Sequence, residues 1–239
     1  MKDLITIFYC SSNQEKPEFE RRIQENILQN RGDLHIIAVT QKPQPTFGGV
    51  VPENYTNICV GDDVGVSGFN FFRQTLIALQ NIKTPFALSC EADCTYPPDY
   101  FQFVPERLDK CYRNKNLYVM GQHRTYFYKK EEGATHAQIV GTEFYKKKLE
   151  ELFEGEPMWD ASQKNFPKEK LRAKRDDVFN VYDKDEIEYY ETENPVVQIK
   201  TSQSMRHYTN SDRIPRHDIP YWGNGREYRK KFYDIGEMH

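Results

Sequence analysis

The order of apolar segments in the first hundred residues constrains the fold more than any other feature of this sequence. Short, continuously apolar runs, typical of buried strands, alternate with longer segments whose apolar residues recur at helical spacing. Strands that alternate with helices in this way build a largely parallel sheet with helices packed on its faces. We therefore expect an α/β fold with a central, mostly parallel sheet. The sequence predicts strands at 5–10, 34–40, 57–61 and 85–93 and helices at 16–30 and 68–82.

The second half of the chain is less regular than the first. It predicts one or two strands within 117–130, a strand followed by a helix within 135–155, and a late strand at 196–202. Residues 156–195 are polar and highly charged, and the tail predicts a loop followed by a short helix. No linker divides the chain, so we expect a single domain, residues 1–239, with an elaborated C-terminal half.

Composition and the N-terminal residues exclude several protein classes. Apolar residues make up 38% of the 239 residues and aromatic residues 14%, which is enough for a packed core. The opening MKDLITIFYC is too short for a membrane span and lacks the architecture of a signal peptide. The five cysteines are odd in number and include no CxxC pair. We therefore expect reduced, mostly buried thiols in a cytoplasmic protein, without a disulfide framework or a zinc site.

Two carboxylates follow the last strand of the alternating part at a spacing that suits a metal. Glu91 and Asp93 come directly after the apolar run FALSC, and Pro97 and Pro98 follow shortly after. Residues two apart in an extended chain point to the same side, so both carboxylates would face one point above the sheet edge. Oxygen ligands at one point repel each other unless a cation lies between them, and Mg²⁺ or Mn²⁺ bound together with phosphates fits that need. A single carboxylate here would more simply cap a turn, but the pair at the carboxyl end of a parallel strand predicts a ligand site.

Charge is unevenly distributed along the chain, although the formal net charge is only −3. Residues 50–110 contain eight acidic and four basic side chains, whereas residues 200–231 contain eight basic and three acidic ones. One interpretation of the basic stretch is a solvated helix with ordinary aromatic packing. The other is a basic rim that faces a diphosphate or a nucleic-acid backbone. The aromatic residues that lie among the basic ones are Tyr208, Tyr221, Trp222 and Tyr228.

Three stretches of the N-terminal half share a pattern with a known enzyme family. They are ITIFYC with the following SSN, GVSGFNFFRQTLIAL before the acidic strand, and CEADCTYPPDYF. In these stretches the chain resembles the GT-A glycosyltransferases, nucleotide-sugar-dependent enzymes with a Rossmann-like α/β core. The last stretch is similar to the DxD motif of that family, with Glu91 in place of the first aspartate, and to small phage and bacterial sequences in which E-x-D precedes Tyr-Pro-Pro.

The resemblance covers residues 4–104 well and 117–150 loosely, and beyond these it is limited to VVQIKTS and IPYWG. It implies a single GT-A domain with a nucleotide-sugar-binding half, 1–104, and an acceptor-side half, 105–239. Asp93 would hold a Mn²⁺ or Mg²⁺ ion that bridges the diphosphate of the donor. Glu91 would contact the ribose, or the metal through water.

Further residues of the donor site are implied by position. Arg73, on the helix before the acidic strand, would lie near the donor. Many members of the family supply a late metal ligand, often a histidine; Thr201 takes its place here, and His207 is the predicted substitute, with a surface histidine in a basic loop as the alternative. The residues implied beside the base and ribose of the nucleotide are Cys10, Ser11, Ser12 and Asn13.

Two residue pairs in the second half are candidates for contacts with phosphate or acceptor. His123 and Arg124 follow a strand and are predicted to face the donor phosphates, although such a pair is as often structural. An inverting enzyme needs a carboxylate that takes the proton of the acceptor hydroxyl. Glu143, at the start of a predicted helix, and Asp160, beside Trp159, are the candidate bases. Each has a structural alternative, because acidic residues favour the first turn of a helix and tryptophan favours a core.

Together these features predict a metal-dependent glycosyltransferase that moves a sugar from a nucleoside diphosphate sugar, in this fold more often a uridine one, to an acceptor hydroxyl. Two acceptor classes stay open: a hydroxymethylated base in phage DNA, which the basic tail favours, and a glycan or small molecule. A DNA enzyme would turn the base out of the duplex, and Trp159 or Trp222 would fill its place. A phage protein of this kind would act in the host cytoplasm.

Two other functional classes fit parts of the sequence. A nucleotidyltransferase shares the α/β core and an acidic metal pair. It would need a glycine-rich, basic loop directly after the first strand, where this chain has SSNQEK. A non-catalytic carbohydrate- or DNA-binding module would have a degenerate site, and the intact E-x-D argues against it.

Overall fold

The computed structural model describes residues 1–162, 181–204 and 211–234 of the chain. A seven-stranded sheet with the order β10-β6-β9-β4-β1-β2-β3 forms its centre. The four strands of the N-terminal half run parallel to one another: β1 (Ile5–Ser11), β2 (His35–Thr40), β3 (Tyr55–Cys59) and β4 (Phe86–Glu91). The predicted α/β fold with a mostly parallel central sheet is therefore confirmed.

The other half of this sheet is mixed in direction. Strand β9 (Gln138–Gly141) runs antiparallel to both β4 and β6 (Cys111–Asn114), and β10 (Ile187–Tyr190) runs parallel to β6. Strands β6 and β10 were not predicted, because four residues with polar members carry too little periodicity to stand out in the sequence.

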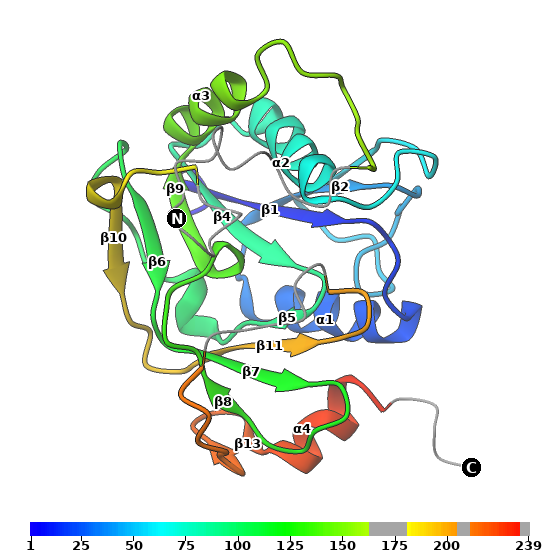
Figure 1. Ribbon diagram of the computed structural model, residues 1–239, viewed down its shortest axis with the longest axis vertical. Helices are drawn as coiled ribbons and strands as arrows, with labels where there is room; N and C mark the ends of the chain where they lie inside the picture. Colours follow the sequence, from blue (N-terminus) through cyan, green and yellow to red (C-terminus); the bar gives the residue numbers. More distant parts are fainter. Residues whose placement is uncertain (163–180, 205–210, 235–239) are drawn as a thin grey trace.

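Alternate side chains of the buried strands pack on helices from opposite faces of the sheet. Ile7 and Tyr9 of β1 join the core under α1 (Pro17–Asn30), whereas Phe8 joins the core under α2 (Gly68–Asn81) and α3 (Thr142–Leu152). Figure 1 shows α2 and α3 on one side of β1 and β4, and α1 on the other. The sheet therefore has a helix-covered face on each side, and its strand ends remain as the place for a ligand.

A smaller sheet shares one hydrophobic core with α1 and has the order β5-β11-β7-β8. Its strands are β5 (Cys94–Thr95), β11 (Val196–Lys200), β7 (Leu117–Gly121) and β8 (Tyr128–Lys129). The tail adds the hairpin of β12 (Asp218–Ile219) and β13 (Gly223–Asn224), and then α4 (Gly225–Phe232). Tyr228 of α4 is buried, and its hydroxyl lies 2.7 Å from Thr95 Oγ1, so α4 packs on this sheet.

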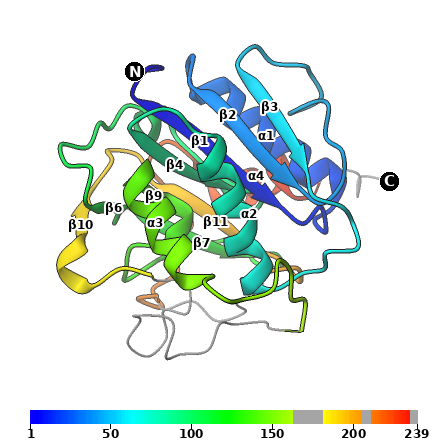
Figure 2. The same cartoon turned by 90° about the horizontal axis from the view of Figure 1, so that it is seen from above.

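Three single-turn 3₁₀ helices complete the described elements: Pro98–Phe101, Thr135–Ala137 and Lys184–Glu186. Viewed from above, in Figure 2, α2 and α3 lie across the strands of the central sheet. Within the described ranges, none of the helices combines the length and the apolar character that a membrane crossing requires.

Candidate active site

Strands β1, β2 and β4 of the central sheet and β7 and β11 of the smaller sheet bring their carboxyl ends to one side of the molecule. Cys10 of β1 pairs with Glu91 of β4, and Ser11 pairs with Thr40 of β2, so these three strands end together. Figure 1 shows β11 and β7 pointing the same way as β1 and β4. We call this side the carboxyl edge; it contains the loops that follow β1, β2, β4, β7 and β11.

Asp93 lies in the turn after β4, and strand β11 holds it in place. Its backbone carbonyl accepts a hydrogen bond from Ile199 N at 2.8 Å. Its carboxylate accepts from Gln198 Nε2, at 3.0 Å and 3.3 Å for the two oxygens, and from Ser204 Oγ at 3.4 Å. Cys94 Sγ donates to it as well, at 3.2 Å. Asp93 is 9% exposed, so this carboxylate has a defined position at the carboxyl edge.

Glu91 ends β4 and is half-buried beside Asp93. Burial, together with the negative charge of Asp93, raises the pKa of Glu91 to about 8, and Lys200 and Lys130 act in the opposite direction. The two carboxylates therefore resist being charged together, as expected for oxygen ligands without their cation. The structure places the two residues close enough for the charge of Asp93 to act on Glu91, and their joint binding of a metal stays a prediction.

A third carboxylate, Glu15, joins the pair from the loop between β1 and α1. Thr201 Oγ1, just after β11, donates to Glu15 Oε1 at 2.6 Å. Burial raises the pKa of Glu15 to about 7; the Thr201 hydrogen bond opposes this, and the charges of Asp93 and Glu20 add to it. Glu15 was not among the site residues predicted from the sequence. Its position in the loop after the first parallel strand could have indicated a site residue, because such loops meet at the carboxyl edge.

The loop after β1 is ordered by its own polar side chains. Asn13 N donates to Ser11 Oγ at 2.9 Å, and Asn13 Oδ1 accepts from Lys42 N, after β2, at 2.9 Å. Ser12 lies half-buried between them. Cys10 differs from these residues, because its thiol points into the core toward Thr75 and burial raises its pKa to about 12. Only the backbone of Cys10 is therefore available to a nucleotide.

Arg73 has a structural role in place of the predicted donor contact. Its guanidinium donates to the carbonyl oxygens of Glu156, at 3.1 Å, and Pro157, at 2.6 Å. The same group lies 3.8 Å from the centre of the Phe153 ring. These contacts fix the chain that leaves α3 against α2.

Glu143 is not part of the acidic cluster. It begins α3, directly after β9, and its side chain is 77% exposed and paired with Lys146. Because β9 runs antiparallel to β4, its last residue, Gly141, lies opposite Phe86, the first residue of β4. Glu143 is therefore at the opposite end of β4 from Glu91, where it cannot take a proton at the carboxyl edge.

Asp160 lies beside the start of α2. Its backbone N donates to Asn70 Oδ1 at 2.8 Å, and its carbonyl accepts from Ser67 Oγ at 2.7 Å. Its carboxylate accepts from Ser162 N at 2.9 Å, and its two chain neighbours line a groove of about 490 Å³. The groove is lined by Val60, Asp63, Val64, Trp159 and Ala161.

The remaining predicted residues follow β7 or lie outside the described residues. His123 and Arg124 are exposed just after β7, whose last residue, Gly121, is opposite Lys200 at the end of β11. His123 Nε2 lies 3.0 Å from Gln122 Nε2, and Arg124 lies over the Tyr126 ring. These two residues are therefore at the carboxyl edge of the smaller sheet. His207 falls within 205–210, outside the described residues.

Comparison with known proteins found no matching family model and no matching curated protein. Among solved structures, the chain is similar to TarS 1–349 of S. aureus in complex with UDP-GlcNAc, with 9% identity over 84% of this chain and a TM-score of 0.47. The chain is also similar to the glycosyltransferase GlyE of Streptococcus pneumoniae TIGR4, with 12% identity over 81% of this chain and a TM-score of 0.42. It is similar to the bifunctional IspDF of Campylobacter jejuni, with 15% identity over 61% of this chain and a TM-score of 0.38. The chain spans 60%, 46% and 43% of these structures, respectively. None of these values transfers the role of a residue to this chain.

Proposed function

We propose that the protein is a metal-dependent glycosyltransferase that moves a sugar from a nucleoside diphosphate sugar to an acceptor hydroxyl. The observation that carries the proposal is the pair Glu91 and Asp93 at the carboxyl end of a central parallel strand, with Glu15 beside it. Open α/β sheets bind nucleotides at this edge, and a diphosphate there requires positive charge next to the carboxylates.

The residues at the carboxyl edge fit a Mn²⁺ or Mg²⁺ ion. Asp93 and Glu91 offer carboxylate oxygens, and the elevated pKa of Glu91 indicates that the pair lacks compensating charge. Gln198 supplies a further oxygen: its Oε1 is buried without a hydrogen-bond partner among the described residues, while its Nε2 holds Asp93. When bound, such an ion neutralises the charge that develops on the leaving diphosphate.

The chain's own residues would bind and orient the two substrates. Lys200 and Lys130, which lie close enough to lower the pKa of Glu91, place positive charge beside the diphosphate. The ordered loop at Ser11 and Asn13 offers polar groups to the nucleoside. Asp160 remains the proposed base, with Trp159 in the groove beside it as a surface on which a sugar or base can stack.

Nucleoside diphosphate binding tests the proposal directly. We expect UDP to bind at least about 10-fold more tightly in Mn²⁺ than in EDTA, because without a cation the diphosphate meets Glu15, Glu91 and Asp93. Isothermal titration measures the two affinities. A panel of sugar nucleotides, assayed for hydrolysis with and without Mn²⁺, then identifies the donor. Equal UDP affinity in EDTA and Mn²⁺ would assign the phosphates to Lys130, Lys200, His123 or Arg124 without a metal.

For the acceptor we propose DNA that carries a hydroxymethylated base, with a glycan as the alternative. Helix α4 supports DNA because Arg226, Lys230 and Lys231 are exposed on it, and Tyr221 nearby is 50% exposed. Arg229 is less available, because it pairs with Asp234 at 2.7 Å.

Trp222 does not fit the predicted role of filling the place of a flipped base. Its Nε1 donates to Pro195 O at 2.6 Å, and its ring packs against Tyr228 and Phe232. This tryptophan therefore belongs to the packing of α4 on the smaller sheet. Trp159 is the other residue that the sequence predicted for that role, and the exposed Tyr221 is a further candidate.

Salt dependence distinguishes the two acceptor classes. Affinity for duplex DNA should fall with salt at roughly −0.9 per phosphate contacted. Replacing Arg226, Lys230 and Lys231 together by Gln should flatten that slope and leave sugar-nucleotide hydrolysis unchanged, as measured by fluorescence anisotropy and a hydrolysis assay. The matched control replaces Lys2, Arg107 and Lys147, exposed cations elsewhere on the molecule, by Gln. Transfer to a small acceptor without salt-dependent DNA binding would favour a glycan or small-molecule acceptor.

A further inference from the structure

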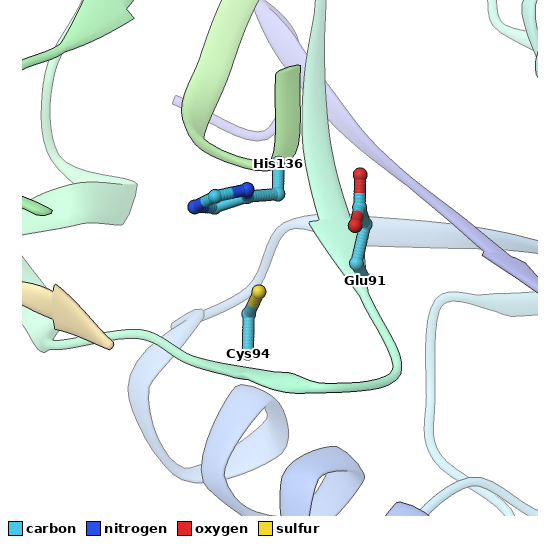
Figure 3. A group of neighbouring side chains, drawn as sticks. All are labelled: Glu91, Cys94 and His136. Carbon is cyan, nitrogen blue, oxygen red and sulfur yellow. The ribbon is translucent and has the colours of Figure 1, made fainter. Parts of the chain in front are cut away.

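Three side chains of metal-binding type gather beside the end of β4. They are Glu91 at the end of that strand, Cys94 in β5, and His136 in the 3₁₀ helix before β9. One carboxylate oxygen, the sulfur and one ring nitrogen lie within 4.8 Å of one another. Figure 3 shows that the three residues come from separate stretches of the chain and meet in one space. Tertiary folding therefore creates a cluster of oxygen, sulfur and nitrogen ligands that the spacing of these residues in the sequence does not predict.

Two members of the cluster are buried and Glu91 is half-buried, and the polar groups of the cluster have few partners. Cys94 is 0% exposed and His136 is 4% exposed. Within the described part of the chain, neither the Glu91 carboxylate nor the His136 ring forms a hydrogen bond, although Tyr96 OH bonds the backbone of both residues. The Cys94 thiol donates to Asp93 Oδ1, at 3.2 Å. The Glu91 carboxylate and the His136 ring can therefore accept a further partner, and a cation between them and the thiol would serve all three.

We infer that Glu91, Cys94 and His136 bind a borderline-soft divalent cation of the Zn²⁺ class. Thiolate and imidazole are the ligands that Zn²⁺ prefers, whereas Mg²⁺ and Mn²⁺ favour oxygen. Three protein ligands with a fourth position open is an arrangement that Zn²⁺ adopts. Ligand atoms at roughly 2.0–2.3 Å from one ion lie about 3–4 Å apart, and the three atoms here lie within 4.8 Å of one another.

Binding would change the protonation of the cluster, because the Cys94 thiol and, where it carries a proton, the Glu91 carboxyl group both release a proton to solvent when they act as ligands. The Cys94 S–H bond breaks, a sulfur–metal bond forms, and the proton that now points to Asp93 leaves to solvent. Glu91 is shared with the proposed Mn²⁺ or Mg²⁺ site, so the two kinds of cation would compete for it. The soft-cation site itself does not depend on the proposed transfer reaction.

Cobalt spectroscopy of the metal-free protein tests the inference. With Co²⁺ as the probe and a non-thiol reductant present, wild-type protein should show a thiolate-to-cobalt charge-transfer band, and added Zn²⁺ should remove it. Cys94→Ser should abolish the band. The matched control is Cys59→Ser, which removes the exposed cysteine at the end of β3 and should leave the band unchanged.

Zn²⁺ affinity and thermal stability give a second readout, and circular dichroism of each variant excludes misfolding as the cause. Loss of a direct ligand should weaken Zn²⁺ binding by at least about 100-fold in Cys94→Ser, because removing even a supporting partner of a ligand costs 10–100-fold. Zn²⁺ should raise the Tm of wild type and of Cys59→Ser, but not of His136→Gln, whose circular dichroism verifies the fold. A charge-transfer band that persists in Cys94→Ser or disappears in Cys59→Ser overturns the inference, as does an unchanged Zn²⁺ affinity in Cys94→Ser.

Discussion

Replacing Asp93 by asparagine is expected to reduce Mn²⁺-dependent sugar transfer by about 10²–10³-fold, the usual cost of losing one group that stabilises developing charge. The fold should remain intact. Asparagine has the shape of aspartate, and its one side-chain oxygen can still accept from Gln198 together with either Ser204 or Cys94. The charge of Asp93 faces other carboxylates rather than a salt-bridge partner. Release of nucleoside diphosphate in an acceptor assay measures the activity, and thermal unfolding monitors the fold.

The control for this prediction is Asp33→Asn. Asp33 is exposed just before β2, at the end of the sheet opposite to the carboxyl edge, so its charge should not affect transfer. Activity close to wild type in Asp93→Asn, at saturating Mn²⁺, would contradict the assignment of Asp93 as a metal ligand. Activity lost together with the unfolding transition would instead show that Asp93 has a structural role.

Replacing Glu91 by glutamine is expected to stabilise the metal-free protein at alkaline pH while impairing transfer. The pKa of Glu91 is about 8 in the folded protein, compared with an ordinary value of 4.5. Between these values the folded protein retains a proton that the unfolded chain has released. The stability of wild type therefore falls as pH rises from about 4.5 to about 8. Above pH 8 the contribution of the retained proton is lost completely.

The magnitude follows from the size of the shift. Each pKa unit corresponds to about 1.4 kcal/mol, and because Glu91 keeps part of its solvent contact we expect about 2–4 kcal/mol. In EDTA, Glu91→Gln should match wild type near pH 4.5 and unfold at higher denaturant concentration than wild type at pH 8.5. Chemical denaturation at both pH values measures this difference.

Two comparisons make the Glu91 prediction specific. The exposed residue Glu53, changed to Gln, should not alter the pH dependence. At pH 8.5, Mn²⁺ should raise the stability of wild type, because the cation compensates the negative charge of Glu91. It should have little effect on the stability of Glu91→Gln, which lacks that charge. A stability difference between Glu91→Gln and wild type that does not vary with pH would mean that the carboxyl group titrates normally.

Local patterns were sufficient to predict the N-terminal half of the fold. The alternation of apolar strands with amphipathic helices depends on residues a few positions apart, so it is legible in the sequence and matches β1, α1, β2, β3, α2 and β4. The position of Glu91 and Asp93 at the carboxyl edge followed from the same pattern, because a carboxylate pair at the end of a parallel strand must lie at the sheet edge.

The other candidate residues depended on the direction of strands, which periodicity does not encode. A strand followed by a helix was predicted around Gly141, but an antiparallel β9 places Glu143 at the wrong end of β4. Arg73 has the charge expected of a phosphate ligand, yet its position on α2 directs it to the carbonyl groups of Glu156 and Pro157. Strand direction decided the first case, and the contacts between α2 and the segment after α3 decided the second.

The sequence by itself determined the α/β architecture and the place of the acidic pair, because hydrophobic periodicity and the end of a strand are local properties of the chain. Only the tertiary structure decided which distant residues join that pair. Glu15 reaches it through Thr201, 186 positions away, and His136 reaches Cys94 across strands that the chain forms between them. These contacts depend on the order and direction of strands in the two sheets, which are set by packing of the whole chain.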